Sequence, residues 1–249
     1  MYSHFSAFYD KIMAEVDYQR WAGYITDIVE RSGTPVESVL ELACGTGSVL
    51  LELERINRFP FAVGLDKCAD MVKLSAAKAR KSRVKAHFIA AEVQNFTLKR
   101  RFDLILCLFY SFNYLVTDRD LHRTLMNVYC SLADRKLFIF DVILRRKIET
   151  FFPNGTHAED LGDLAYIWQC QCLQMDRIYE IRADFFKRTR GNSFRKYTET
   201  HVKRVFGLDE LKALLDEMDF TVTGIYDALS FREPDQYSQR VFFICRKGG

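Results

Sequence analysis

The sequence contains no long apolar run. None of its runs approaches the roughly 20 residues that a membrane-spanning helix needs, so we expect no membrane partner. The chain shows no apolar secretory stretch at its start, and its seven cysteines are an odd number scattered along the sequence. Such cysteine usage favours reduced thiols over a disulfide framework, which predicts a cytoplasmic protein.

Metal-binding patterns are missing as well. Cys170 and Cys172 lie close together, but Cys107 and Cys130 are too far away in the sequence to complete a usual ligand spacing. No two of the five histidines stand at the spacing of a helix or a zinc finger. We therefore predict no metal site.

The overall composition is that of a globular protein. Of the 249 residues, 49% are hydrophobic and 28% charged, which suits one large core or a core with a small appendage. The net charge is only +3, which does not by itself indicate a nucleic-acid-binding surface. A nucleic-acid partner is therefore not expected.

A strand, a glycine turn and a helix follow one another in the first third of the chain. The apolar run 36–43 is typical of a buried strand, Gly45 and Gly47 allow a tight turn, and residues 48–55 continue at helical spacing. This succession is the geometry of nucleotide-binding folds, because a helix start offers free N–H groups and glycine permits a close approach of the ligand.

Two details of this stretch argue against a pyrophosphate ligand. The dinucleotide-binding pattern requires a third glycine where this chain has Leu50, and no Gly-Lys-Ser/Thr follows for a P-loop. Glu41 stands just before the turn. A carboxylate there repels phosphate but suits a cationic or amino-bearing ligand.

The segment Glu41-Leu-Ala-Cys-Gly-Thr-Gly47 resembles the first motif of the class I S-adenosylmethionine-dependent methyltransferases of the small-molecule type. Ala43 stands where the family usually has its first glycine, a departure that a small residue tolerates. The resemblance implies S-adenosylmethionine as cofactor, with Glu41, Ala43, Gly45 and Gly47 in its binding site.

Further signals follow at the spacing of this family. A second predicted strand ends in Asp66, and an acid at that place suits the ribose hydroxyls of any nucleotide. The resemblance adds Lys67 and places Met71 on one face of the adenine, although a core methionine on a helix is the alternative. It places Glu92, with the amide of Val93, at the adenine amino group.

The loop after the fourth predicted strand lies where open α/β sheets bind their ligands. The resemblance implies cofactor contacts for Leu108 and Asn113. Related enzymes often carry an acid where this chain has Tyr110, so the role of that acid is not transferred. The loop lacks the Asn/Asp-Pro-Pro-Tyr pattern, which argues against a nucleobase or a glutamine amide as methyl acceptor.

Aromatic residues mark the N-terminal segment. Apolar side chains recur at helical spacing from Tyr18 to Ile28, which predicts an amphipathic helix that ends near Gly33. The segment resembles the N-terminal lid of small-molecule methyltransferases, which implies cofactor contacts for Tyr9 and Trp21 and an acceptor contact for Tyr2. Packing of the aromatic side chains on the core is the alternative.

Strands and helices alternate along most of the chain. We predict the remaining elements as strands at 84–90, 102–107, 136–143, 220–226 and 240–245 and helices at 118–132 and 208–218. This alternation indicates an α/β fold with a doubly wound, mostly parallel sheet. The resemblance implies the seven-stranded, Rossmann-like sheet of class I methyltransferases.

The alternation stops between residues 144 and 206. Three segments there, 164–172, 177–186 and 194–205, alternate apolar and polar residues, which predicts an inserted antiparallel β-sheet of three strands. Basic residues gather at one hairpin end, which indicates a solvated turn beside an edge strand, with RNA or phosphate binding as the alternative. These residues are Lys187, Arg188, Arg190, Arg195 and Lys196.

Three parts of the chain are therefore predicted. Residues 1–34 form a helical lid, residues 35–143 and 204–249 form the cofactor-binding domain, and residues 144–203 form a substrate subdomain. We expect the acceptor to contact Tyr2, Tyr110, Trp168, His201 and Arg204. If the acceptor is an amine, Tyr110 or His201 is the candidate to assist its deprotonation.

These patterns predict an enzyme that transfers the methyl group of S-adenosylmethionine, by in-line displacement, to a nitrogen or oxygen of a small molecule. Two alternatives keep the fold: a non-catalytic module that binds S-adenosylmethionine and regulates a partner, and a methyltransferase of RNA or protein. An NAD-dependent oxidoreductase is disfavoured by Leu50 and by the lack of a Tyr-x-x-x-Lys pair.

Overall fold

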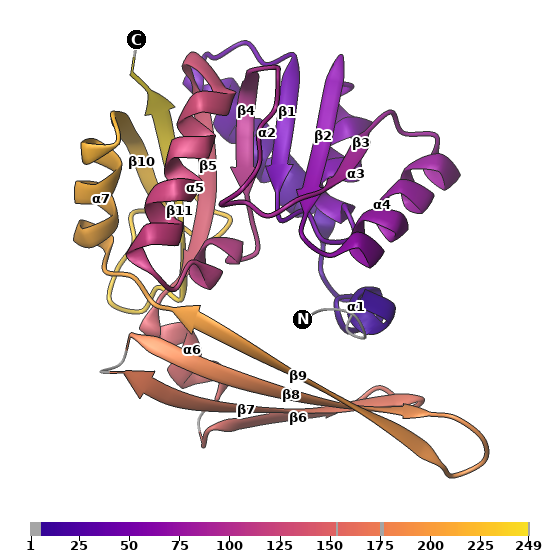
Figure 1. Cartoon of the computed structure of the whole chain (residues 1–249). Coiled ribbons are helices and arrows are strands. Elements are labelled where there is room, and N and C mark those ends of the chain that lie inside the picture. Colours follow the sequence, from indigo (N-terminus) through magenta and orange to yellow (C-terminus); the bar gives the residue numbers. More distant parts are fainter. Residues whose placement is uncertain (1–5, 153, 175–176, 249) are drawn as a thin grey trace.

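The computed structural model describes residues 6–152, 154–174 and 177–248. Within these ranges the chain forms a seven-stranded sheet flanked by helices and a separate four-stranded sheet (Figure 1). The strands of the large sheet are β1 Ser38–Leu42, β2 Phe61–Asp66, β3 His87–Ala90, β4 Phe102–Cys107, β5 Leu132–Ile143, β10 Phe220–Asp227 and β11 Arg240–Lys247. The helices are α1 Ser6–Ile12, α2 Tyr18–Ser32, α3 Ser48–Asn57, α4 Ala69–Ser82, the short η1 Ser111–Tyr114, α5 Asp118–Ser131, α6 Arg145–Phe151 and α7 Leu208–Glu217.

The large sheet has the strand order β10-β11-β5-β4-β1-β2-β3. The strands from β1 to β5 pair in parallel, and β11 pairs antiparallel with both β5 and β10. The order reverses between β1 and β4, which creates the switch point where such sheets bind ligands. The predicted fold class, a doubly wound and mostly parallel seven-stranded sheet with an inserted antiparallel sheet, is confirmed.

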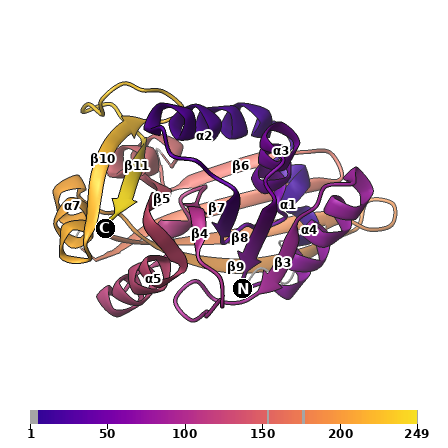
Figure 2. The same ribbon diagram turned by 90° about the horizontal axis from the view of Figure 1, so that it is seen from above.

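Helices cover both faces of the large sheet (Figure 2). Because side chains alternate along a strand, Leu40 and Ile105 face α5 and α7, whereas Val39 and Leu104 face α2 and α3. All four side chains are fully buried. Gly33 ends α2 in the left-handed conformation, at the place that the sequence predicts.

The second sheet contains four strands instead of the predicted three. Its strands are β6 Thr156–Asp160, β7 Leu164–Gln174, β8 Ile178–Arg188 and β9 Phe194–Arg204, all antiparallel and in sequence order. The sequence does not predict β6, because the residues of this strand are mostly exposed and polar and its stabilising contacts are backbone pairs with β7. Nor does it predict α6, which connects β5 to this sheet.

The four-stranded sheet crosses beneath the carboxyl ends of the parallel strands (Figure 1). The chain leaves the large sheet after β5 and returns to it through α7. The arrangement therefore brings the ends of β1, β2 and β4 toward one face of the inserted sheet, with α1 beside them.

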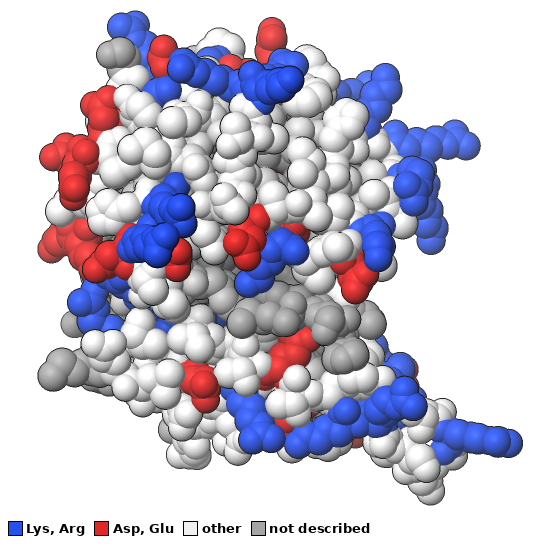
Figure 3. Space-filling view, in the orientation of Figure 1, with Lys and Arg blue, Asp and Glu red and all other residues white. Residues whose placement is uncertain are grey.

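The basic hairpin lies at the far end of β8 and β9. Figure 3 shows Lys and Arg over the lower right of the molecule, where Figure 1 places this hairpin. Lys187 pairs with Asp163, and Lys196 pairs with Asp184 at 3.0 Å, so part of the positive charge is balanced locally. No helix of the described ranges has the length and apolar character needed to cross a bilayer.

Candidate functional site

A cavity lies between the carboxyl ends of the parallel strands and the four-stranded sheet. Its walls come from the turn after β1, the end of β2, the loop after β4, helix α1 and strands β7 to β9. The predicted site residues that line it are Tyr9, Glu41, Ala43, Gly45, Asp66, Lys67, Met71, Val93, Leu108, Tyr110, Trp168 and His201. Segments far apart in the sequence thus meet around one space.

The glycine turn after β1 forms the inner wall of the cavity. Ala43, Gly45 and Gly47 all have positive φ, between 51° and 72°, so the backbone turns sharply where glycine is favoured. A Cβ on Gly45 would come no closer than 4.0 Å to the Tyr9 ring, which leaves this backbone open toward the cavity. A Cβ on Gly47 would lie 2.8 Å from Phe88 of β3 and 2.9 Å from Ser75 of α4, so Gly47 permits close packing against both and does not line the cavity.

Asp66, at the end of β2, holds the turn in place. Its Oδ2 accepts a hydrogen bond from the Gly45 N–H at 2.9 Å, and its Oδ1 accepts one from the Cys68 N–H at 2.8 Å. The residue is only 8% exposed, and burial raises the pKa of its carboxyl group. Each carboxylate oxygen keeps a second lone pair, so Asp66 has the capacity to accept hydrogen bonds from two ribose hydroxyls.

Glu41 presents a buried carboxylate oxygen without a partner. The residue is 4% exposed, and among the described residues its Oε2 has no hydrogen-bond partner. Burial raises the pKa of the Glu41 carboxyl to about 8, and the Leu50 N–H opposes this shift. An unpaired buried acceptor needs a donor, which fits the amino group of S-adenosylmethionine at this place.

Helix α1 closes one side of the cavity. Its Tyr9 lines the cavity, and its Phe8 ring lies 6.0 Å from the ring of Phe185 on β8. On the other side, Lys78 of α4 donates to Asp10 of α1 at 2.7 Å. Helix α1 therefore contacts both the large domain and the inserted sheet. Tyr2, the predicted acceptor contact, lies outside the described residues.

Trp21 and Glu92, like Gly47, were predicted to bind the cofactor but do not line the cavity. Trp21 is 6% exposed and stacks on Phe109, with ring centroids 4.1 Å apart. It therefore packs on the core, which was the alternative to a cofactor contact. Glu92 forms an isolated bridge with Asn95 and is also absent from the cavity lining. Its neighbour Val93 does line the cavity.

Asn113 has a structural position that the sequence analysis did not foresee. The residue is fully buried, and its side-chain oxygen accepts from the Ile143 N–H at 3.0 Å. Its Nδ2 donates to the carbonyl oxygens of Ile143 at 3.3 Å and Arg204 at 2.7 Å. Asn113 therefore joins the end of β5 to the end of β9 and leaves no side-chain donor for a cofactor.

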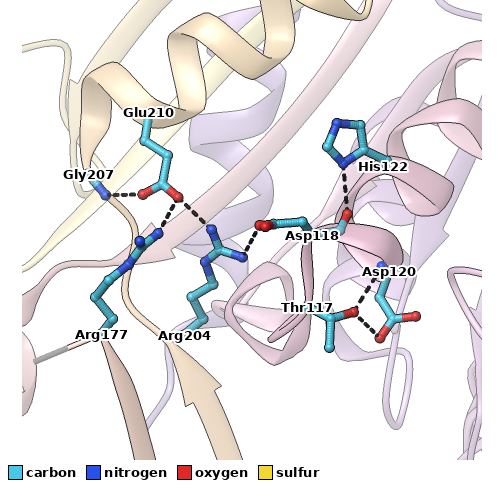
Figure 4. Close-up of polar contacts among 8 residues, drawn as sticks. All are labelled: Thr117, Asp118, Asp120, His122, Arg177, Arg204, Gly207 and Glu210. Carbon is cyan, nitrogen blue, oxygen red and sulfur yellow. Dashed lines mark hydrogen bonds and ion pairs between the residues drawn. The ribbon is translucent and has the colours of Figure 1, made fainter. Parts of the chain in front are cut away.

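Arg204 is also engaged away from the cavity (Figure 4). Its guanidinium pairs with Asp118 at 2.6 Å and with Glu210 at 2.5 Å, and Arg177 pairs with the same Glu210. These groups connect β9 to α5 and α7. The predicted acceptor contact of Arg204 is therefore replaced by a role at the base of the inserted sheet.

Tyr110 follows β4 in a strained conformation. Phe109 and Tyr110 have φ of 57° and 51°, a region that costs energy for residues with side chains. The Tyr110 N–H donates to Asp141 Oδ2 at 2.9 Å, which helps to hold this turn. The Tyr110 ring then faces the cavity, where burial raises the pKa of its phenol.

His201 and Lys203 reach the cavity from β9. The Nδ1 of His201 lies 3.3 Å from the hydroxyl of Tyr114, and burial together with Lys203 lowers the pKa of the imidazole to about 4, so His201 is neutral near pH 7. Lys203, Tyr114 and Tyr18 also line the cavity, although the sequence does not predict them as site residues. The signal for Lys203 was its place two residues after His201, because such residues share a face of a strand.

Comparison with known proteins agrees with this architecture. The family model described as a methyltransferase domain matches residues 39–135. A protein of Geobacillus sp. (strain WCH70) named as a methyltransferase is 26% identical over 247 residues, which cover 99% of each chain. The dTDP-3-amino-3,6-dideoxy-alpha-D-glucopyranose N,N-dimethyltransferase of Streptomyces fradiae is 32% identical over 109 residues, 44% of this chain and 40% of that protein.

A solved structure also matches over the whole chain. It is that of an S-adenosylmethionine-dependent methyltransferase from Clostridium acetobutylicum ATCC 824, which superposes with a TM-score of 0.88 at 26% identity and covers 100% of this chain and 99% of its own. Together with the strand order and the orphaned Glu41 carboxylate, these matches confirm the predicted family, enzyme class and cofactor. Over its whole length the chain is similar to S-adenosylmethionine-dependent methyltransferases, and its strand order is that of class I.

Proposed function

We propose that the enzyme transfers the methyl group of S-adenosylmethionine to a nitrogen or oxygen of a small molecule held between the two sheets. The observation that carries this proposal is the composition of one cavity. One part of its wall contains Glu41 and Asp66, which suit the cofactor. The β4 loop and the inserted sheet contribute Tyr110, Trp168 and other side chains.

In this proposal the cofactor lies along the ends of β1, β2 and β3. Asp66 binds the ribose hydroxyls, and Glu41 binds the amino group of the methionine part. Met71, which is 2% exposed and lines the cavity, covers one face of the adenine, and the backbone of Val93 lies at the adenine edge. The sulfonium of the bound cofactor supplies the methyl group and its own leaving group.

The protein then aligns the acceptor and excludes water from the reaction. Displacement at the methyl carbon needs the acceptor atom in line with the leaving sulfur, so a shaped cavity provides much of the catalysis. Tyr110, Trp168 and Ile181 form walls of this cavity. His201 orients the acceptor through a hydrogen bond of its Nε2, because its Nδ1 already contacts the Tyr114 hydroxyl.

Two further points support a small acceptor. The four-stranded sheet lies across the carboxyl ends of the parallel strands (Figure 1), and three of its strands contribute side chains to the cavity. The Streptomyces fradiae relative is named as an N,N-dimethyltransferase of an amino sugar, and its similarity covers 44% of this chain. These points favour a small molecule over RNA or protein.

The proposal is tested with S-adenosylmethionine that carries a tritiated methyl group and an extract of the cells from which the gene comes. After reaction, the extract is separated by ultrafiltration into small molecules and macromolecules. We expect label in the small-molecule fraction, and label confined to the macromolecules would contradict the proposal. Trp168→Ala is the control variant: it should reduce labelling but still bind S-adenosylhomocysteine, because Trp168 lies on the acceptor side.

A further inference from the structure

Lys203 differs from the other buried cations of the molecule. Arg204 pairs with two carboxylates, and Lys247 donates to the Leu132 carbonyl oxygen at 2.9 Å and pairs with Asp134 at 3.0 Å. Lys203 is similarly buried, at 7% exposed, yet it forms neither an ion pair nor a hydrogen bond with any described residue. Its ammonium therefore lacks the partner that a buried charge requires.

The surroundings of Lys203 are aromatic and open to the cavity. Its Nζ lies 4.0 Å from the centre of the Tyr110 ring and 4.9 Å from that of Tyr114, and all three residues line the cavity. The nearby Asp141 uses its Oδ2 for the Tyr110 N–H and Arg240, and its Oδ1 has no hydrogen-bond partner among the described residues. Asp141 raises the pKa of Lys203 but forms no ion pair with it. Burial and Arg240 lower the pKa of Lys203 to about 7, as expected for an ammonium without a counter-ion.

A second donor without a partner belongs to Trp168, another residue that lines the cavity. The indole Nε1 of Trp168 is buried and has no hydrogen-bond partner among the described residues. Trp168 lies on β7 and Lys203 on β9. Trp168 pairs with Ala183 of β8, and Ala183 pairs with Glu199 of β9. Because Lys203 follows Glu199 by four residues, Lys203 and Trp168 are on the same face of the sheet. An indole N–H and an ammonium only donate, so both require an acceptor.

We propose that the methyl acceptor is an acid whose anionic group, a carboxylate or a phosphate, binds Lys203 and accepts a hydrogen bond from Trp168. The inference rests on the proposed function, because it takes this cavity as the acceptor site. The anion balances the charge of Lys203, and its oxygens meet the unsatisfied donors of both residues. It lies on the side of the cavity away from Glu41 and Asp66, whose carboxylates suit the cofactor. An acidic acceptor is therefore held with its anion against the inserted sheet.

The test uses the two indole N–H signals of the protein in nuclear magnetic resonance, because the chain contains only two tryptophans. Trp21 lies in the core and serves as the internal reference, and Trp168→Phe assigns the second signal. The protein is saturated with S-adenosylhomocysteine and titrated with potassium acetate or potassium phosphate to about 50 mM, because ions this small bind weakly. Potassium chloride at equal ionic strength and uncharged acetamide are the controls.

We expect a saturable shift of the Trp168 signal with acetate, phosphate or both, and no shift of the Trp21 signal. Acetate alone would identify a carboxylate acceptor, and phosphate alone a phosphorylated one. Lys203→Met, which keeps the length of the side chain, should raise the dissociation constant at least about tenfold. Lys73→Met, an exposed lysine on α4, should leave it unchanged.

Three results would overturn the inference: no saturable shift with either anion, an equal shift with acetamide, or unchanged anion binding by Lys203→Met. An unshifted Trp21 signal and retained S-adenosylhomocysteine binding show that the variant is folded. The experiment involves no turnover, so its failure leaves the proposed methyl transfer to a small molecule intact. That transfer fails separately, if label enters only macromolecules.

Discussion

Lys78 on α4 lies 2.7 Å from Asp10 on α1, between their Nζ and Oδ1 atoms. The same ammonium donates to the hydroxyl oxygens of Thr46 at 2.8 Å and Ser48 at 3.1 Å. One side chain thus connects the helix that carries Tyr9 to the glycine turn that this helix covers. The position of α1 over the cavity depends in part on this connection.

We expect Lys78→Met to weaken S-adenosylhomocysteine binding by about twofold to fivefold. The pair is partly exposed, and such pairs contribute about 0.2 to 1 kcal/mol. Titration calorimetry at low and high salt measures the change, which should shrink as salt screens the wild-type pair. Lys73→Met is the matched control, because Lys73 lies on the same helix but pairs with Asp70 in solvent. Equal effects of the two variants would show that α1 does not depend on Lys78.

Asp66 should account for a large part of the affinity of the site for S-adenosylhomocysteine. At about a hundred times its dissociation constant this ligand stabilises the protein by about 2.7 kcal/mol, a rise of about 5 to 10 °C in melting temperature. Asp66→Ala removes two hydrogen-bond acceptors for the ribose and should weaken binding at least about tenfold. NAD should produce no shift. Asp70→Ala is the control, and an unchanged melting shift in Asp66→Ala would exclude a ribose contact.

The pH dependence of cofactor binding should report on Glu41. Burial raises the pKa of this carboxyl group from 4.5 to about 8, so the free protein keeps it protonated near pH 7. A ligand ammonium favours the ionised form, so binding below pH 8 must release the proton. The affinity for S-adenosylhomocysteine should therefore rise with pH, by at most about tenfold per unit, and level off above pH 8. Calorimetry in buffers of different ionisation enthalpy measures the released proton.

Glu41→Gln is the control for this dependence, because it keeps the shape and cannot ionise. Its binding should be weaker near pH 8 and lack the proton release. Its stability should also change in a defined direction. The protonated Glu41 of the free protein contributes stability below pH 4.5 that is lost as the pH rises to about 8. The free energy of unfolding of the variant relative to wild type should therefore increase across that window. A constant difference would show that Glu41 is already ionised.

Gly47 and Gly33 allow a comparison between steric conflict and backbone strain. Both have a left-handed φ, +72° and +63°, but a Cβ on Gly47 would lie 2.8 Å from Phe88 while one on Gly33 would meet nothing within 4 Å. Gly33→Ala should cost about 1 kcal/mol, from strain alone. Gly47→Ala should cost about 2 to 4 kcal/mol, because overpacking adds to the strain. Urea unfolding measures both, and equal costs would mean that the Phe88 ring moves aside freely.

The parts of the fold that the sequence predicts are those with a local periodicity. The apolar run before Gly45 and the alternating residues of β7 to β9 carry their structure in neighbouring side chains. The exposed edge strand Thr156–Asp160 carries no such pattern, since its stabilising contacts are backbone hydrogen bonds to β7. It was missed for that reason.

The site residues that the sequence predicts are likewise those with a local sequence pattern, and the ones it does not predict depend on distant contacts. Asp66 and Glu41 were found because each stands at a strand end beside a turn, a local feature. Lys203 was missed because its lack of a partner depends on which residues the fold brings around it. Arg204, by contrast, is an ordinary polar residue in sequence, and only the fold places it between α5 and α7.

Asn113 is the residue whose assignment changes most between sequence and structure, and its substitution gives the last prediction. It bonds to residues 30 and 91 positions away, at the points where the chain leaves for the inserted sheet and returns from it. Asn113→Asp keeps the shape but replaces two N–H donors by an oxygen facing two carbonyl oxygens. With the carbonyl groups unpaired in a fully buried place, we expect a loss of about 2 to 5 kcal/mol in unfolding free energy.

The same substitution should separate structure from cofactor binding. Hydrogen exchange should become faster at the base of β9, next to Arg204, since the Asn113 side chain joins that strand to β5. S-adenosylhomocysteine should still bind Asn113→Asp under conditions where the variant is folded, because Asn113 does not line the cavity. Lost binding together with unchanged exchange at β9 would restore the cofactor role that the sequence suggested. Faster exchange with retained binding would show that this asparagine acts by fixing the inserted sheet to the large one.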